Sequence, residues 1–263
     1  TLILQQMIEG QDLQQLKKGT SSAEQVTISF WVKGNASATA VAEIYDLDND
    51  VHINQLFSIT TDWVRVELTY DGDTAARVFN DDNGASLQFN IWLHSGSTFS
   101  SGSIQSSWGS NNGGRAAGIS SFYDSTARTF SITGVQLELG SVATDFEHRS
   151  YGEELRLCQR YFYRYKGATQ ERIYNENAGA TAKWWFLTFP EMRTTPTATF
   201  SPGWTSSSSI VVIGGTINSM SVGGGSSTAM SFRVTNSGSG GTVKALYHTD
   251  SFSQDYCYLS AEL

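Results

Sequence analysis

Hydrophobic and polar residues alternate with a period of two along much of the first half of the chain. The alternation is clearest in three segments, residues 26–33, 64–70 and 87–94. A strand with one hydrophobic and one polar face is typical of an antiparallel sheet that packs against a second sheet. Turn signals separate these segments, among them Asp71-Gly72-Asp73 and Asp82-Asn83-Gly84. The pattern predicts a jelly-roll-like β-sandwich in this half.

The second half also contains short strand-like segments. They are residues 161–166, 182–189, 197–200, 209–213, 229–234, 243–247 and 256–259. Several connections between them, such as Gly223-Gly224-Gly225, are runs of Gly and Ser that read as turns or exposed loops. Short strands separated in this way predict a second, smaller β-sandwich.

A short helix is predicted between the two halves. Ser150-Tyr151-Gly152-Glu153 has the S-x-x-E spacing of a capping box, which satisfies backbone donors at the start of a helix. Leu155, Cys158 and Phe162 follow at the spacing of a buried helical face. Alternating tyrosines come next, so we expect the helix to end near Gln159.

The predicted fold class is therefore all-β, with two antiparallel β-sandwich domains joined by a short α-helix. The domains are residues 1–149 and 161–263, and the linker helix is residues 150–160. Composition agrees with this class, because the chain has 25 Gly, 12% aromatic residues and only 16% charged residues, whereas a typical globular domain has roughly 25% charged residues.

The net charge of −8 is concentrated in the first half of the chain. Residues 1–150 contain 8 Lys and Arg against 17 Asp and Glu, a balance of −9, whereas residues 151–263 contain 9 against 8, a balance of +1. Nucleic-acid binding needs a basic patch, so this distribution argues against it. It suits neutral glycans or cation-assisted ligands better.

The two cysteines and the short hydrophobic runs argue against a disulfide-stabilised protein and against a membrane-spanning one. Cys158 and Cys257 do not make a disulfide framework, and both are predicted to be free, buried side chains. No hydrophobic run approaches the roughly 20 residues that cross a bilayer, so membrane insertion is not expected.

Two tryptophans interrupt otherwise polar strand faces and are the first candidates for ligand binding. Trp31 and Trp92 are predicted to face away from the core, and His94 lies near Trp92. A flat indole can stack on the C–H face of a sugar ring while polar neighbours bond the hydroxyls. The alternative is that a neighbouring subunit, a preceding strand or the second sheet covers these tryptophans.

Other aromatics are candidates because they lie in loops or pairs. Trp108 and Tyr123 lie in or after a polar loop, where ligand sites are common. Trp184 has a tryptophan neighbour in a strand, so one of the two is expected to be exposed, and Trp204 is a loop-tip aromatic. The alternative for the loop residues is packing onto their own domain.

An acidic segment is a candidate for calcium binding. Asp46, Asp48 and Asp50 place carboxylates at alternate positions, as a calcium loop begins. The segment lacks the Gly and the final Glu of an EF-hand, which leaves a looser Ca²⁺ site or a solvated acidic turn. No catalytic motif is present, and paired acids lie in turns, so the chain is not expected to be an enzyme.

Residues 134–165 resemble a segment found in bacteriophage tail fibre and tail-tip proteins. The motifs that carry the likeness are VQLELG-S-x-A-T-x-F-E followed by E-E-L-x-L-C-Q-R-Y-F. Met192-Arg193 and Pro196 resemble a later strand and turn of the same proteins. In those proteins a carbohydrate-binding-module-like jelly roll leads into a C-terminal receptor-binding domain. The resemblance places a Ca²⁺ ligand at Glu138, and it implies at least one strand before Leu2 in a longer polypeptide.

The function implied by this resemblance is attachment of a phage to the host cell surface by binding of a surface glycan or lipopolysaccharide. Such proteins are homotrimers in the tail of the virion, are made in the bacterial host cytoplasm and contact other tail proteins. The predicted helix is a place where three chains could meet. Two alternatives remain open, a structural adaptor or shaft segment, and the accessory carbohydrate-binding module of a polysaccharide depolymerase.

Overall fold

The computed structural model describes residues 1–165, 182–200, 210–212, 216–237, 246–248 and 257–263. It consists mainly of antiparallel β-sheets with few helices, which confirms the predicted all-β class. The chain forms two compact units, Thr1–His148 together with Leu263, and Arg149–Glu262, and each is described by itself. None of the described helices is long and apolar enough to cross a membrane.

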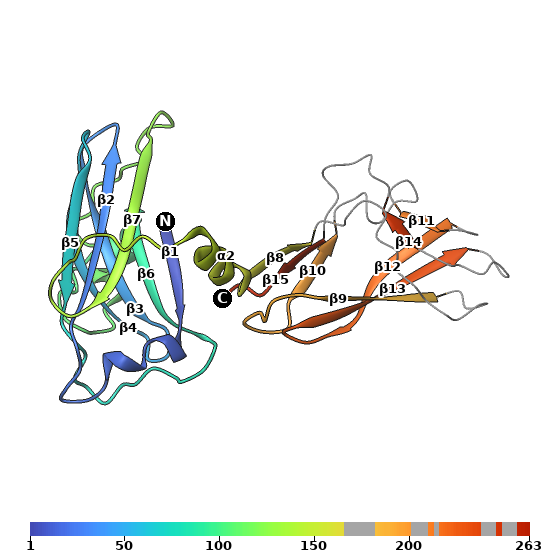
Figure 1. Ribbon diagram of the computed structural model, residues 1–263. Helices are drawn as coiled ribbons and strands as arrows, with labels where there is room; N and C mark the ends of the chain where they lie inside the picture. The colour runs from blue at the N-terminus through green and yellow to red at the C-terminus, as the bar shows by residue number, and fades with distance from the viewer. Residues whose placement is uncertain (166–181, 201–209, 213–215, 238–245, 249–256) are drawn as a thin grey trace. The chain divides into compact units, whose positions relative to one another are not determined.

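The first unit contains two antiparallel sheets that face each other as layers (Figure 1). Sheet A has the strand order β1-β6-β3-β4, and sheet B has the order β5-β2-β7. The strands are β1 (Leu2–Glu9), β2 (Val26–Gly34), β3 (Ala38–Asp46), β4 (Val51–Ile59), β5 (Val64–Tyr70), β6 (Ala85–His94) and β7 (Phe130–Leu139). Two short 3₁₀ turns, η1 (Gly10–Asp12) and η2 (Gln14–Leu16), follow β1.

The core of this unit lies between the two sheets and is built by the alternating residues that the sequence indicates. Val26, Ile28, Phe30 and Val32 of β2 are all buried. They pack with inward residues of β3, β4, β5 and β6, and the rings of Phe30 and Phe57 meet edge to face at 5.2 Å between centroids. Burial of this apolar surface supplies the main driving force for folding of the unit.

A long loop, residues 95–121, covers part of the outer face of sheet A. It contains α1 (Ser97–Ser100) and the 3₁₀ turn η3 (Asn112–Gly114). The loop is held to the edge of β4 by backbone hydrogen bonds, from His52 N–H to the Gly109 carbonyl at 2.8 Å and from Asn54 N–H to the Gln105 carbonyl at 2.7 Å. Sheet A therefore has a hydrophobic layer on both sides over this region.

A second segment, residues 141–147, crosses the outer face of sheet B. Thr144 N–H donates to Glu138 of β7 at 3.1 Å, and Glu147 N–H donates to Gln136 of β7 at 2.8 Å. Arg65 of β5 donates to the Thr144 carbonyl. We call residues 141–147 the strap, since it is fastened to both edge strands of sheet B.

The second unit begins with α2 (Tyr151–Gln159), and its capping box is present as predicted. Ser150 Oγ accepts a hydrogen bond from Glu153 N–H at 3.3 Å, and the Glu153 carboxylate accepts one from Ser150 N–H at 3.0 Å. The prediction of a buried helical face is wrong for the chain alone, because Leu155 is 41% exposed and Cys158 is also exposed.

The strands of the second unit form three small sheets, with orders β10-β15-β8, β12-β13-β9 and β11-β14. They are β8 (Phe162–Tyr165), β9 (Ala182–Thr188), β10 (Thr197–Phe200), β11 (Ile210–Val212), β12 (Thr216–Gly225), β13 (Ala229–Ser237), β14 (Leu246–His248) and β15 (Cys257–Ser260). The first two sheets share a core that includes Leu187, Phe232 and Leu259.

Two residues of the second unit bear on the predictions from sequence. Cys257 is buried as predicted, and burial raises the pKa of its thiol to about 12. Arg193 donates hydrogen bonds to the carbonyls of Ala261 and Glu262 at 2.9 and 2.8 Å. Arg193 thus ties the turn after β9 to the end of the chain.

Candidate functional site

Three half-exposed aromatic side chains gather on the outer face of sheet B. Trp31 of β2 is 42% exposed, Trp63 immediately before β5 is 46% exposed, and Phe146 of the strap is 42% exposed. We call these three side chains the Trp31 face. The structure thus agrees with the prediction that Trp31 points away from the core into solvent.

Strand register explains why Trp31 and Trp63 share this face. Trp31 pairs with Arg65 across the β2–β5 ladder. Side chains two residues apart on a strand point to the same side, so Trp63 follows Arg65 onto the outer face as a diagonal neighbour of Trp31. The sequence carries this signal, because the alternation of residues 64–70 extends back to Trp63.

A β-bulge in β7 makes room for Phe146 beside Trp31. The register of the β2–β7 pairing shifts between Ser29 and Trp31 of β2, and Gly134 of β7 has a φ of +61°. A Cβ on Gly134 would lie 3.5 Å from a Trp31 atom and 3.7 Å from a Phe146 atom. Glycine therefore adopts the left-handed conformation without strain and leaves a floor on which both rings rest.

Polar side chains surround the three aromatics. Arg65 forms an ion pair with Glu67 at 3.1 Å, and its guanidinium is fixed by the strap through Thr144. Lys33 and Thr133, both exposed, lie on the same face of β2 and β7. A flat apolar surface next to hydrogen-bond donors is the arrangement that binds a sugar ring and its hydroxyls.

The prediction that Trp92 faces solvent is wrong. Its side chain is 1% exposed because the loop over sheet A covers it, with the ring of Phe99 at 5.2 Å between centroids. The indole Nε1 donates to the Glu43 carboxylate at 2.9 Å. His94 is half-buried, and its Nδ1 lies 2.6 Å from Ser121 Oγ. Trp92 is thus a core residue of this second hydrophobic layer.

Glu43 is the centre of a buried polar cluster beside Trp92. Its fully buried carboxylate binds the Arg115 guanidinium through two contacts of 2.7 and 2.8 Å. Asn90 and Asn54 donate to it at 2.9 and 3.1 Å. Burial by itself would raise the pKa of Glu43, but the hydrogen bonds and charge of Arg115 and the two amides outweigh burial and lower it. Glu43 therefore stays ionised and serves to anchor the loop.

This shift predicts a pH dependence of stability. Because the pKa of Glu43 is lower in the folded chain, its contribution to stability is complete above the unfolded value of about 4.3 and is lost as pH falls through the folded value. We expect a Glu43→Gln variant to lose less stability between pH 5 and pH 3 than the unchanged chain, measured by urea unfolding. Equal losses in the two proteins would contradict this role.

Trp108 folds back onto its own domain and Tyr123 remains exposed. Trp108 Nε1 donates to the Asp71 carbonyl at 2.7 Å, and the indole packs against the main core. Tyr123 is 39% exposed and meets Phe122 edge to face at 5.2 Å between centroids. Of these two loop candidates, Tyr123 is the more accessible to a ligand.

The acidic segment distributes its carboxylates among different partners. Asp46 is fully buried, Asp48 accepts from Asn80 N–H at 3.0 Å, and Asp50 accepts from the Tyr45 hydroxyl at 2.5 Å. Glu138 belongs to another sheet and accepts from the strap. Among the described residues, no group of three or more acidic, His or Cys side chains could hold a metal. Calcium binding stays a prediction.

Two candidate residues of the second unit are not described as side chains. Trp184 lies in β9, where its backbone pairs with Arg233 of β13. Trp204 lies outside the described residues. The candidate aromatics whose side chains the structure describes are therefore those of the first unit.

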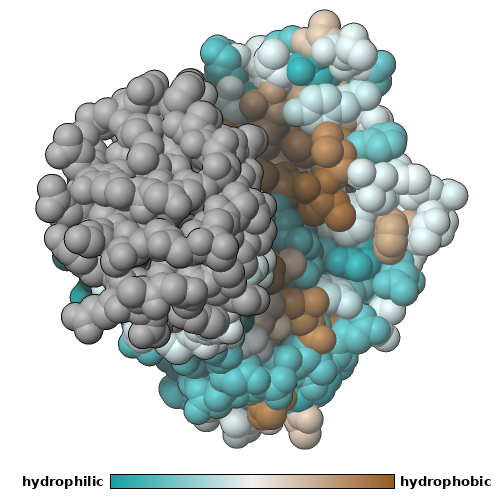
Figure 2. Space-filling view, turned by 90° about the vertical axis from the view of Figure 1, so that its right-hand side faces the viewer, coloured by the Kyte–Doolittle hydropathy of each residue, from teal (hydrophilic) through white to brown (hydrophobic). Residues whose placement is uncertain are grey.

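An apolar groove opens between the edge strands β1 and β7. Its volume is about 350 Å³, and its walls include Leu4, Ile8, Phe89, Ile91, Val135 and Leu137. Figure 2, which views the side of the first unit on which β1 and β7 lie in Figure 1, shows hydrophobic side chains gathered in a hollow. Apolar walls with two glutamines at the rim do not suit a sugar, so the Trp31 face remains the better candidate.

No protein-family model matches this chain, and no curated protein matches it in sequence. Function therefore has to be inferred from the residues and their geometry. Two members of the Trp31 face were not identified from sequence. Trp63 could have been found by extending the strand alternation, whereas nothing in the sequence indicates that Phe146 returns to lie over β7.

Proposed function

We propose that this chain is a component of a bacteriophage tail fibre or tail tip, and that it attaches the virion to a glycan on the host cell surface. The Trp31 face is the proposed contact with the sugar. We propose further that the chain is not an enzyme. The resemblance of residues 134–165 to tail fibre proteins supports the assignment to a phage tail.

The observation that carries the proposal is the gathering of Trp31, Trp63 and Phe146 on one polar sheet face, each more than 40% exposed. Monomeric proteins rarely leave several large aromatics together in water, so such a patch marks a surface that another molecule covers. Indole and phenyl rings suit the C–H face of a sugar, and Arg65 supplies donors for hydroxyl groups.

The charge of the first half bears on the kind of glycan. Its balance of −9 disfavours strongly anionic polymers unless cations intervene. Neutral sugars are the ligands that fit best. Weak contacts of single sugars would be strengthened by several copies of the chain acting together.

The exposed side of α2 supports the proposal that the chain forms homotrimers. Tyr151 is 82% exposed, and Leu155 and Cys158 are also exposed along the same side. Their spacing of four and three residues is that of one heptad of a seam between helices. Light scattering of the chain tests this: a monomer at micromolar concentration would count against the fibre assignment.

Binding of the intact chain to host cells and to a glycan array tests the proposed contact. Replacing Trp31 or Trp63 with alanine is expected to weaken binding roughly tenfold, which corresponds to the loss of about 1.4 kcal/mol when an aromatic anchor is truncated. Phe186→Ala is the matched control, because Phe186 is a 72% exposed aromatic that belongs to β9 of the second unit. Unchanged binding by both tryptophan variants would reject the Trp31 face.

The same measurements separate the two rival functions. If no glycan binds and particles still require the chain for assembly, the chain is a structural adaptor or shaft segment. If a longer polypeptide that contains the chain cleaves a polysaccharide and the chain alone only binds it, the chain is the accessory module of a depolymerase.

A further inference from the structure

A buried lysine meets two buried carboxylates in the first unit. The side chain of Lys18 is 4% exposed, and its Nζ lies 2.5 Å from Asp46 Oδ2 and 2.9 Å from Asp73 Oδ2. A charge-assisted N–H···O contact is usually about 2.7–2.9 Å, so the contact with Asp46 is unusually close. Nζ also donates to the Arg77 carbonyl at 2.9 Å.

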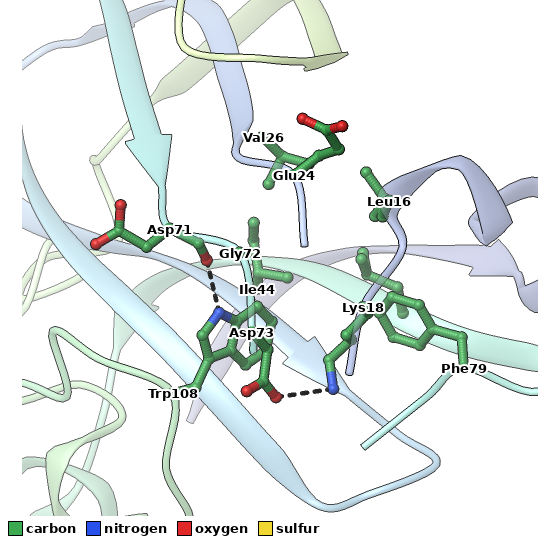
Figure 3. A pocket seen from close by; sticks show the side chains of 11 residues that line it. Leu16, Lys18, Glu24, Val26, Ile44, Asp71, Gly72, Asp73, Phe79 and Trp108 are labelled. Carbon is green, nitrogen blue, oxygen red and sulfur yellow. Dashed lines mark hydrogen bonds and ion pairs between the residues drawn. The ribbon is translucent and has the colours of Figure 1, made fainter. Parts of the chain in front are cut away.

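The surroundings of Lys18 are aromatic. Nζ lies 5.2 Å from the centres of both the Phe79 and Trp108 rings. Figure 3 shows the amine between these rings, with its end directed at the Asp73 carboxylate. These aromatic walls help to shield the amine and the two carboxylates from bulk water, since the three side chains are at most 4% exposed.

The carboxylate of Asp46 is held by donors that could stabilise a tetrahedral intermediate. Its Oδ1 accepts hydrogen bonds from the backbone N–H groups of Asp48 and Asn49 at 2.9 and 3.1 Å. Its Oδ2, which faces Lys18, also accepts from the Asn49 amide at 2.9 Å. Two fixed N–H groups on one oxygen are the arrangement of an oxyanion hole.

We propose that Lys18 and Asp46 form an intramolecular isopeptide bond. A proton moves from the Lys18 ammonium to the Asp73 carboxylate, and the neutral Nζ attacks the Asp46 carboxyl carbon. Negative charge develops on Oδ1, while Oδ2 takes up the two protons that Nζ loses and leaves as water. An ammonium and a carboxylate thus become one amide and one water molecule, so the reaction needs no oxidant or other reagent.

Asp73 is placed to carry the proton between the two groups. Burial by itself would raise its pKa, but hydrogen bonds from Arg77, Lys18 and Ala75 N–H lower it, so Asp73 is ionised. Its Oδ2 lies 2.9 Å from the amine that gives up the proton. A cavity of about 20 Å³ beside Lys18 and Asp73 is large enough for a single water molecule. Holding amine and carboxyl in contact replaces the reagent that such a condensation needs in solution.

The bond would join the segment after η2 to the end of β3. Cys158 and Cys257 are both free, so neither supplies a disulfide. A cross-link between Lys18 and Asp46 would restrict the unfolded chain as a disulfide does, and it would not depend on an oxidising compartment. This inference is independent of the proposed glycan binding, since neither residue belongs to the Trp31 face.

The intact mass of the purified chain tests the bond directly. We expect a mass lower by one water molecule than the sequence gives. Cleavage with a glutamate-specific protease should then release residues 10–24 joined to residues 44–67, fragments that are not adjacent in the sequence. A full mass, or the two fragments only as separate peptides, would overturn the proposal.

Two variants distinguish the proposed bond from loss of a water molecule at another position, such as cyclisation at Asp71-Gly72. Lys18→Arg keeps the positive charge and cannot form the amide, so its chain should have the full mass. Lys17→Arg changes an exposed lysine that pairs with Glu24 at 2.6 Å, and its chain should still lack one water. Loss of water from the Lys18→Arg chain as well would place the loss at another residue and refute the bond.

Discussion

Replacing Arg115 with methionine is expected to lower the free energy of unfolding of the first unit by about 3–5 kcal/mol. Glu43 is fully buried, and Arg115 is the cation that compensates its charge through two contacts below 3 Å. Methionine keeps the length and apolar stem of the side chain, so the change removes the charge with little loss of packing. The carboxylate is then left buried without an opposite charge, which is strongly unfavourable.

Hydrogen exchange of the β3 and β6 amides measures this loss in the intact chain, because it reports on the first unit separately. Arg128→Met is the matched control: Arg128 pairs with Asp124 at 2.7 Å, but both side chains are partly exposed, and such a surface pair contributes little to stability. We expect the double change Glu43→Met with Arg115→Met to recover most of the loss. Equal effects of the two arginine changes would show that the buried pair does not secure the loop.

Strand positions were predictable from sequence because the side-chain period of a strand is short and local. The segment 64–70 predicted from alternation is β5 itself, and 87–94 lies within β6. The capping box at Ser150 and the end of the helix at Gln159 were also predictable, since both depend on residues adjacent in sequence. Local signals therefore account for most of the fold class.

Contacts between distant segments were not predictable in the same way. Alternation places Trp92 on the outer face of its strand, but it does not reveal that a loop of Ser, Gly and Asn returns to cover that face. The sequence does not predict β12, because Gly223 to Gly225 have the composition of a turn, whereas in the structure Gly224 and Gly225 pair with Ser231 and Met230 of β13. Pairing with a neighbouring strand outweighed the weak strand propensity of glycine there.

The residues of the Trp31 face likewise divide into those that local sequence signals predict and those that depend on contacts between distant segments. Trp31 was identified as a solvent-facing aromatic because its strand neighbours are polar. Phe146 reaches the same face only because the strap is fastened by Glu138 and Gln136, and Gly134 leaves space beneath it. Such tertiary hydrogen bonds have no periodic signature in the sequence.

The two tryptophans that the sequence treats alike are expected to differ sharply when each is replaced by alanine. Trp92→Ala should lower the free energy of unfolding of the first unit by about 3–5 kcal/mol, because its side chain is 1% exposed and its indole donates to Glu43. The change leaves a cavity beneath Phe99 and removes one donor from a buried carboxylate, so both effects act in the same direction.

Trp31→Ala is the matched control for this prediction, since it removes the same atoms from the outer face of the other sheet. Its side chain is 42% exposed, and we expect a loss of about 1 kcal/mol, the centre of the distribution for point mutations. Hydrogen exchange of β6 and β2 amides in both variants measures the difference. A ligand should distinguish the variants in the opposite sense, because Trp31→Ala is expected to reduce the stabilisation that a bound glycan gives, whereas Trp92→Ala should retain it. Similar losses of stability in the two variants would mean that the loop does not cover Trp92 in solution, and Trp92 would then return as a candidate for stacking on a sugar.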